Sequence, residues 1–150
     1  MGRREKEPIT LRKGESEKLE VMGADVRFLC GAEDTGKAWS LMEVTLPQHS
    51  GPPPHDHPWG EAYYVVEGEV QFSISGREER FKAGDFIYAP AGTLHGFQGA
   101  SERPARVLIF DAPAHAEGFF RDVHREVRSP QDFAKVPEIG ARHQIRFRVS

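Results

Sequence analysis

The segment that most constrains this chain is HDHPWGEAYYVVEG, residues 55–68. His55, His57 and Glu61 are spaced two and four residues apart, so on an extended strand they share one face. Burying two imidazoles and a carboxylate together is unfavourable unless a cation lies among them. Because neutral imidazoles and carboxylates suit first-row transition ions, the spacing favours a divalent metal site over a solvated polar loop.

The composition excludes several classes of protein. With 150 residues, 38% of them hydrophobic, the chain is long enough for one domain with its own core. Its net charge of -3 provides no general attraction to nucleic acid or to anionic membranes, so we expect neither as a partner. Cys30 is the only cysteine, which rules out an intrachain disulfide and a thiolate metal cluster. Without a membrane-length apolar run or the apolar core of a secretory signal, we expect a cytoplasmic protein.

Short apolar runs separated by turn residues predict a fold rich in β-strands. Fifteen glycines and eleven prolines are spread along the chain, and the runs between them have the spacing of a sandwich or small barrel. In AWSLMEVTL, Met42 lies on the face opposite Trp39, and apolar residues on both faces predict a strand buried on both sides for part of its length. The proline-rich loop PQHSGPPP then leads into residues 55–68, and Gly68 permits a turn after them.

The chain changes character after Pro113. Apolar residues recur at helical spacing in HAEGFFRDVHREV and predict an amphipathic helix. Ser129 and Pro130 are typical of a second helix start, which Pro137 should then break or kink. The final IRFRV alternates like an edge strand.

A second motif, GDFIYAPAGTLHGFQG over residues 84–99, supplies a fourth candidate ligand. It contains a tight turn at Pro90-Ala91-Gly92, with His95 on the strand that follows. Two antiparallel hairpins could bring His95 opposite the first three candidates, although spacing alone leaves this open.

Together the two motifs resemble those of the cupin superfamily and cover roughly residues 40 to 110. The conserved positions of the family's motifs fall on His55, His57, Glu61 and Gly68 in the first and on Gly84, Pro90, Gly92 and His95 in the second. There are two departures. Gly51 is closer to His55 than the usual pattern places it, and Gly99 replaces the asparagine that often closes the second motif.

The resemblance implies an all-β fold, a double-stranded β-helix (jelly-roll or cupin barrel) with a short helical C-terminal tail. We expect a disordered N-terminus over residues 1–8, the barrel over 9–113, and helices and an edge strand packed on it over 114–150. The implied cofactor is one divalent transition metal held by His55, His57, Glu61 and His95. Three nitrogens and one oxygen favour Fe, Mn, Ni, Cu or Zn over Ca or Mg. An octahedral ion would keep about two open positions, whereas zinc could be closed by these four ligands.

Side-chain parity and nearness to the ligands select candidate walls of a substrate pocket: Trp59, Tyr63, Phe72, Phe97 and Met42. Such a cavity would suit a flat, largely apolar ligand. Ordinary barrel core is the alternative for these residues, and it is the preferred interpretation for Phe72.

The function implied by the resemblance is a metal-dependent dioxygenase acting on a small, largely apolar or aromatic substrate, as in cupins that cleave flavonols such as quercetin. Glu61 could also leave the metal and serve as the catalytic base. The alternatives are a small-molecule-binding or sensing module without turnover, and a metal-dependent isomerase or decarboxylase, which would need a basic side chain in the pocket. Because small cupins often pair through their outer sheets, we expect a homodimer.

Overall fold

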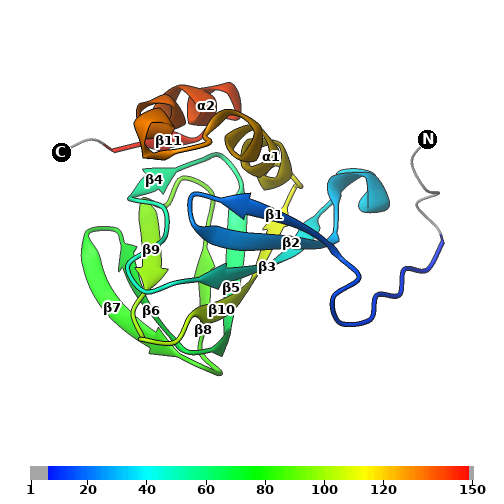
Figure 1. The fold of residues 1–150 in the computed structure, drawn as a ribbon, viewed down its shortest axis with the longest axis horizontal. Helices are drawn as coiled ribbons and strands as arrows, with labels where there is room; N and C mark the ends of the chain where they lie inside the picture. Colours follow the sequence, from blue (N-terminus) through cyan, green and yellow to red (C-terminus); the bar gives the residue numbers. More distant parts are fainter. Residues whose placement is uncertain (1–6, 149–150) are drawn as a thin grey trace.

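The computed structural model describes residues 7–148 and contains two β-sheets that face one another, with helices across one end (Figure 1). The six-stranded sheet has the order β1 (Glu17–Val21), β2 (Ala24–Cys30), β3 (Ser40–Leu46), β10 (Ala105–Ala112), β5 (Gly60–Glu67) and β8 (Phe86–Ala89). The five-stranded sheet has the order β11 (Arg146–Phe147), β4 (His55–Asp56), β9 (His95–Gly99), β6 (Glu69–Ile74) and β7 (Arg77–Lys82). The strand pairs are antiparallel, and the predicted all-β jelly-roll barrel is confirmed.

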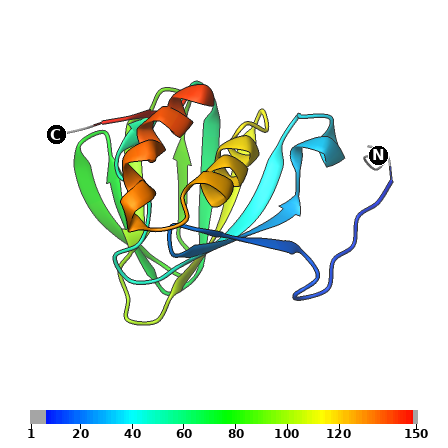
Figure 2. The same cartoon turned by 45° about the horizontal axis from the view of Figure 1, so that its top comes forward.

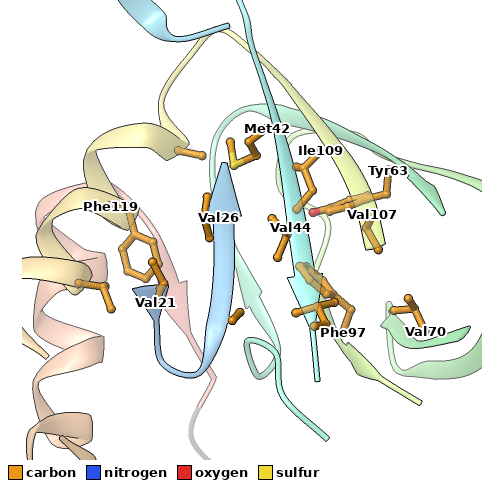
Figure 3. Close-up of a cluster of buried hydrophobic side chains, with 14 of the residues drawn as sticks. Val21, Val26, Met42, Val44, Tyr63, Val70, Phe97, Val107, Ile109 and Phe119 are labelled. Atoms are coloured by element: carbon orange, nitrogen blue, oxygen red, sulfur yellow. The ribbon is translucent and has the colours of Figure 1, made fainter. Parts of the chain in front are cut away.

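The core lies between the two sheets because alternate residues of each strand point inward. In β3 the inward residues are all buried, including Met42 and Val44, whereas the residues of the other face are only partly buried. The prediction of a strand buried on both sides is therefore wrong, because no further layer of the described chain covers the outer face of this sheet. Opposite the inward residues of β3, Val70 and Phe72 of β6 are fully buried. Figure 3 shows Met42, Val44 and Val70 within one continuous apolar cluster.

Two α-helices and two 3₁₀-helices complete the described chain. A 3₁₀-helix, Ala32–Thr35, connects β2 to β3, and the C-terminal tail consists of α1 (Ala116–Glu126), a 3₁₀-helix (Pro130–Lys135) and α2 (Val136–Arg142). The tail helices lie over one end of the barrel (Figure 2). None of the helices between residues 7 and 148 has the length and apolar character needed to cross a bilayer.

The tail largely follows the sequence prediction, with one difference at its second helix. Helix α1 buries Phe119 and Val123, the residues at helical spacing. The second helix begins at Pro130 as a 3₁₀-helix, and it changes to α2 just before Pro137 instead of breaking at that residue. This difference follows from proline's compatibility with the first helical turn, where its missing N–H removes no intrahelical bond.

The start of α1 depends on a buried carboxylate at the end of β10. Asp111, with no exposed surface, accepts hydrogen bonds at Oδ2 from the backbone N–H groups of His115 and Ala116, each at 2.9 Å. Its Oδ1 accepts a hydrogen bond from the Ser40 hydroxyl. Burial raises the pKa of Asp111, and these donors partly oppose that rise. The last barrel strand therefore directs the tail over the barrel end.

The end of the tail is fastened to the strand that carries His55. β11 pairs with β4, and Asp56 accepts hydrogen bonds from Arg146 Nε at 2.9 Å and from Arg148 Nη2 at 3.1 Å. Burial alone would raise the pKa of the Asp56 carboxyl, but the two guanidinium groups hold it below its ordinary value. The predicted N-terminal disorder over residues 1–8 falls mainly on residues 1–6, which lie outside the described part of the chain.

A comparison of two phenylalanines tests which face of the barrel supplies the core. Phe72 has no exposed surface, whereas Phe86 is 61% exposed on the outer face of the six-stranded sheet. We expect Phe72→Ala to lower the free energy of unfolding by about 3 to 5 kcal/mol through lost burial and a residual cavity. The matched control Phe86→Ala should change it by less than about 0.5 kcal/mol. Urea unfolding measures both, and equal effects would contradict this placement of the core.

Candidate metal centre

Three strands and one connection bring the four candidate ligands together at the helix-covered end of the barrel. His55 lies on β4, Glu61 on β5 and His95 on β9, while His57 lies in the short connection between β4 and β5. His55 and His95 are direct partners in the antiparallel register, so two residues forty positions apart in the chain face each other. All four side chains are buried, with exposed fractions between 1% and 7%.

The potential ligand atoms of the three histidines, one ring nitrogen from each, form one cluster. They lie within 4.8 Å of one another, and the ring centroids of His55 and His95 are 4.4 Å apart. Glu61 joins this cluster through Oε1, which lies 3.3 Å from Nε2 of His57 and 3.5 Å from Nε2 of His95. The site therefore contains three nitrogen donors and one carboxylate oxygen.

The backbone determines which nitrogen of each imidazole faces the cluster. Nδ1 of His55 is 2.8 Å from the carbonyl oxygen of Pro53, and Nδ1 of His57 is 3.0 Å from that of Trp59. Nδ1 of His95 is 2.8 Å from the carbonyl oxygen of Thr93. Because a carbonyl oxygen can only accept, each Nδ1 carries a proton, so Nε2 is the nitrogen that each ring directs into the cluster and that presents a lone pair when the ring is neutral.

Neighbouring donors keep Glu61 charged although it is buried. Trp59 Nε1 donates to Oε2 at 3.3 Å, and the Tyr63 hydroxyl donates to Oε1. Burial would raise the pKa of Glu61, but His57, His95 and Tyr63 together hold it well below its ordinary range. Burial and the charge of Glu61 raise the pKa of Tyr63 well above 10, so its hydroxyl remains a donor.

Two nitrogen atoms of the cluster indicate whether the site is suited to a metal ion. Within the described chain, Nε2 of His57 and Nε2 of His95 are buried and have no hydrogen-bond partner. Buried polar atoms are normally satisfied, so such atoms require a reason. A cation among them provides one, since metal-binding histidines typically direct one nitrogen to the ion and donate the other N–H to a carbonyl or carboxylate. The donor set fits a transition metal.

The candidate pocket residues lie at different depths. Trp59 stacks on His57 with centroids 4.1 Å apart, and both Trp59 and Phe97 line a cavity of about 40 Å³ beside the cluster. Tyr63 reaches the site through its bond to Glu61. Met42 and Phe72 do not line this cavity and lie fully buried in the barrel core.

Sequence reasoning did not identify the part of the cavity wall that the C-terminal tail supplies. Phe119 and Phe120 of α1 and Phe147 of β11 line it, and the Phe147 ring is 5.3 Å from the His55 ring. The amphipathic pattern of α1 did predict that Phe119 is buried, but it did not indicate which part of the barrel the helix covers. The pairing of β11 with β4 has no signal in a single sequence.

Comparison with known proteins finds a cupin domain within this chain. Residues 42–111 match the family described as "Cupin domain". The chain is 26% identical over 115 residues to quercetin 2,3-dioxygenase of Bacillus subtilis, covering 76% of this chain and 34% of that protein. It is 29% identical over 97 residues to dimethylsulfoniopropionate lyase DddQ of Ruegeria pomeroyi, covering 59% and 48%. This chain therefore spans less than half the length of either relative.

A solved structure with a similar fold is an RmlC-like cupin from Shewanella frigidimarina. The TM-score is 0.63 at 18% identity, and the match covers 74% of this chain and 96% of that one. At this identity the likeness concerns the fold alone.

The protonation of His55 tests the geometry of the metal-free cluster. Burial, with the nearby His95, lowers the pKa of His55 from 6.5 to about 4. Since the unfolded chain binds this proton first, His55 should reduce the free energy of unfolding as pH falls from 6.5 towards 4. We expect its ring resonances in metal-free protein to titrate near pH 4, with Nδ1 protonated above that pH. His55→Gln should flatten the stability profile between these pH values, and titration of His55 near pH 6.5 would contradict the arrangement.

Proposed function

Residues 42–111 of this chain form a cupin domain. We propose that this domain binds one divalent transition metal and catalyses a dioxygenase-type oxidation. The proposed ligands are His55, His57, Glu61 and His95. The observation that carries the proposal is the pair of buried, unpartnered Nε2 atoms on His57 and His95. Their Nδ1 atoms are already bound to carbonyl oxygens, so the free lone pairs point into a common space beside a carboxylate. The candidate ions are Fe, Mn, Ni, Cu and Zn.

The chain's own residues prepare this site in three ways. Trp59 and Tyr63 hold the Glu61 carboxylate in place by hydrogen bonds, and the carbonyl of Pro53 holds the His55 ring. The apolar side chains that line the cavity exclude water from the cluster. A metal bound there would supply Lewis acidity and a template for substrate and dioxygen.

The environment of Glu61 favours its role as a charged ligand over its role as a base. A carboxylate whose pKa is depressed is a weak proton acceptor, because its charged form is already stabilised. To act as the catalytic base, Glu61 would first have to lose its contacts with His57, His95 and Tyr63. We therefore assign Glu61 to metal binding.

The cavity lining favours oxidation of an apolar substrate over the alternative reactions. No lysine or arginine is among the described residues lining the cavity beside the cluster, and Glu61 is its only acidic residue. A decarboxylase or an isomerase of anionic sugars would require a cation to hold the substrate's charge. The similarity to a quercetin dioxygenase also supports oxidation. The second candidate function is binding of an apolar small molecule without turnover, because the same cavity lining suits it.

The homodimer stays a prediction, and the outer face of the six-stranded sheet supports it. Tyr64 and Phe110 are 44% and 40% exposed there, and Phe86 and Tyr88 of the neighbouring β8 are about 60% exposed. Tyr64 pairs directly with Phe86 in the strand register. A contiguous apolar face of this kind is typical of a protein interface.

The metal content of the protein tests the proposed site. We expect protein purified without added metal to contain about one transition ion per chain by elemental analysis, as for a single four-ligand site. His95→Ala should abolish that content because it removes a buried donor from the centre of the cluster. The matched control is His124→Ala, since His124 lies on α1 and hydrogen-bonds to the backbone of Glu20. Unchanged metal content in His95→Ala would reject His95 as a ligand.

Oxygen uptake tests the reaction class. Metal-loaded protein should consume dioxygen with at least one substrate among flavonols, β-diketones and thiols, the largest rate being expected for an uncharged aromatic substrate. An oxygen electrode measures the uptake, and metal-free His95→Ala serves as the negative control. If the metal-loaded protein consumes no oxygen with any of the three classes, the dioxygenase proposal fails and the binding module takes its place.

A further inference from the structure

A second apolar cavity of the described chain adjoins the candidate metal centre. It has a volume of about 260 Å³ and extends between the barrel interior and the C-terminal helices. It shares part of its wall with the 40 Å³ cavity at the ligand cluster; the common residues are Pro52, Phe97, Ile109, Phe119, Phe120 and Phe147. We call the larger cavity the apolar chamber.

The chemistry of the lining restricts what the apolar chamber can bind. Inside, it is lined by residues such as Val26, Val44 and Leu46, all buried. Among the described residues that line it, none is an aspartate, glutamate, lysine or arginine, and His49 and Ser50 are its only polar side chains. A charged ligand would lose its hydration without gaining a partner of opposite charge. The lining therefore selects uncharged, apolar molecules.

Two partly exposed residues mark the mouth of the chamber. Met22 is 38% exposed, and Phe133 of the C-terminal tail is 44% exposed, yet both line the cavity. Met22 and Gly23 have φ of 50° and 87° and form the two-residue turn between β1 and β2, which presents Met22 at the rim. Solvent contact at these residues provides an approach for a ligand.

Phe147 stands between the chamber and the ligand cluster. Its ring lies 5.3 Å from the His55 ring and 6.0 Å from the Phe119 ring, and it lines both cavities. A molecule in the chamber would thus contact the aromatic residues that border the metal ligands. Half of the residues that line the chamber lie outside residues 42–111, in β1, β2 and the C-terminal tail. Its shape consequently depends on parts of this chain that lie outside the segment matching the cupin domain.

We propose that the apolar chamber binds an uncharged, apolar small molecule of one or two rings and presents it to the metal centre. The volume of the chamber lies just below the range of roughly 300 to 1,000 Å³ that is typical of drug-sized ligand sites. The chamber can therefore hold a molecule of one or two rings. The presentation to the metal rests on the proposed function. The binding itself depends only on the chamber and does not require a metal.

Two probes that share a ring system and differ in charge test the proposal. At pH 7, 2-naphthol is neutral and 2-naphthoate is an anion. Calorimetric titration of metal-free protein should detect binding of 2-naphthol, with 2-naphthoate at least about tenfold weaker because its carboxylate has no partner in the lining. Ala24→Leu, which adds volume inside the chamber, and Phe133→Glu, which places a charge at its mouth, should each weaken 2-naphthol binding by at least about fivefold.

The matched control is Leu11→Glu, because Leu11 is 43% exposed, as Phe133 is at 44%, but does not line the chamber. It should leave 2-naphthol binding unchanged. Phe133 is itself partly exposed, so Phe133→Glu tests the mouth even if Ala24→Leu does not fold. Equal affinity for both probes, no detectable 2-naphthol binding, or binding that Phe133→Glu leaves unchanged would overturn the proposal.

Elemental analysis of the same variants separates this proposal from that of the metal site. Weakened 2-naphthol binding in Phe133→Glu with unchanged metal content supports the chamber as a distinct part of the site. If wild-type protein as purified contains no transition ion but binds 2-naphthol, the metal proposal fails and the chamber proposal stands.

Discussion

The arrangement of the candidate site depends on three hydrogen bonds between imidazole Nδ1 atoms and backbone carbonyl oxygens. Each carbonyl lies two residues from its histidine, so the local path of the chain orients each ring. For His55 that path is the proline-rich loop, which lies close against β9. A Cβ added at Gly51 would come within 2.0 Å of the carbonyl oxygen of Phe97, and one at Gly96 within 2.8 Å of the Pro54 nitrogen. The two glycines permit the loop and the strand to approach each other closely enough for His55 and His95 to meet.

A second constraint is the charge of Glu61, which lies in a largely apolar environment. A buried carboxylate is tolerated only when donors or cations surround it. Trp59 and Tyr63 provide two donors, and they also form part of the aromatic surroundings of the cluster. These side chains therefore combine apolar walls with polar contacts. This combination allows a polar ligand cluster to lie directly beside an apolar chamber.

The sequence allowed the local features of the fold to be predicted, while contacts between distant segments required the structure. Alternation along β3 placed Met42 and Trp39 on opposite faces, and the helical spacing identified Phe119 as buried, because both patterns are properties of one element. Alternation predicts that Phe97 and Phe72 both point inward, but it does not show how deep each one lies. Phe97 lines the cavity at the cluster, whereas Phe72 lies deeper in the core. That distinction depends on position along the barrel axis, which alternation does not report. The place of Phe147 beside His55 depends on the pairing of β11 with β4, which joins segments ninety residues apart.

Besides this pairing, the side chain of Asp56 connects the tail to the segment that carries the candidate ligands His55 and His57. Asp56 lies between His55 and His57, and successive side chains of an extended segment point to opposite faces. The two histidines therefore face the cluster while Asp56 faces the tail, where it accepts hydrogen bonds from Arg146 and Arg148. A displacement of the tail would remove Phe147 from the chamber wall and strain the segment that positions two ligands. The tail that lines the apolar chamber is thus bound to the segment that carries His55 and His57, so the chamber wall and the candidate ligands share one structural support.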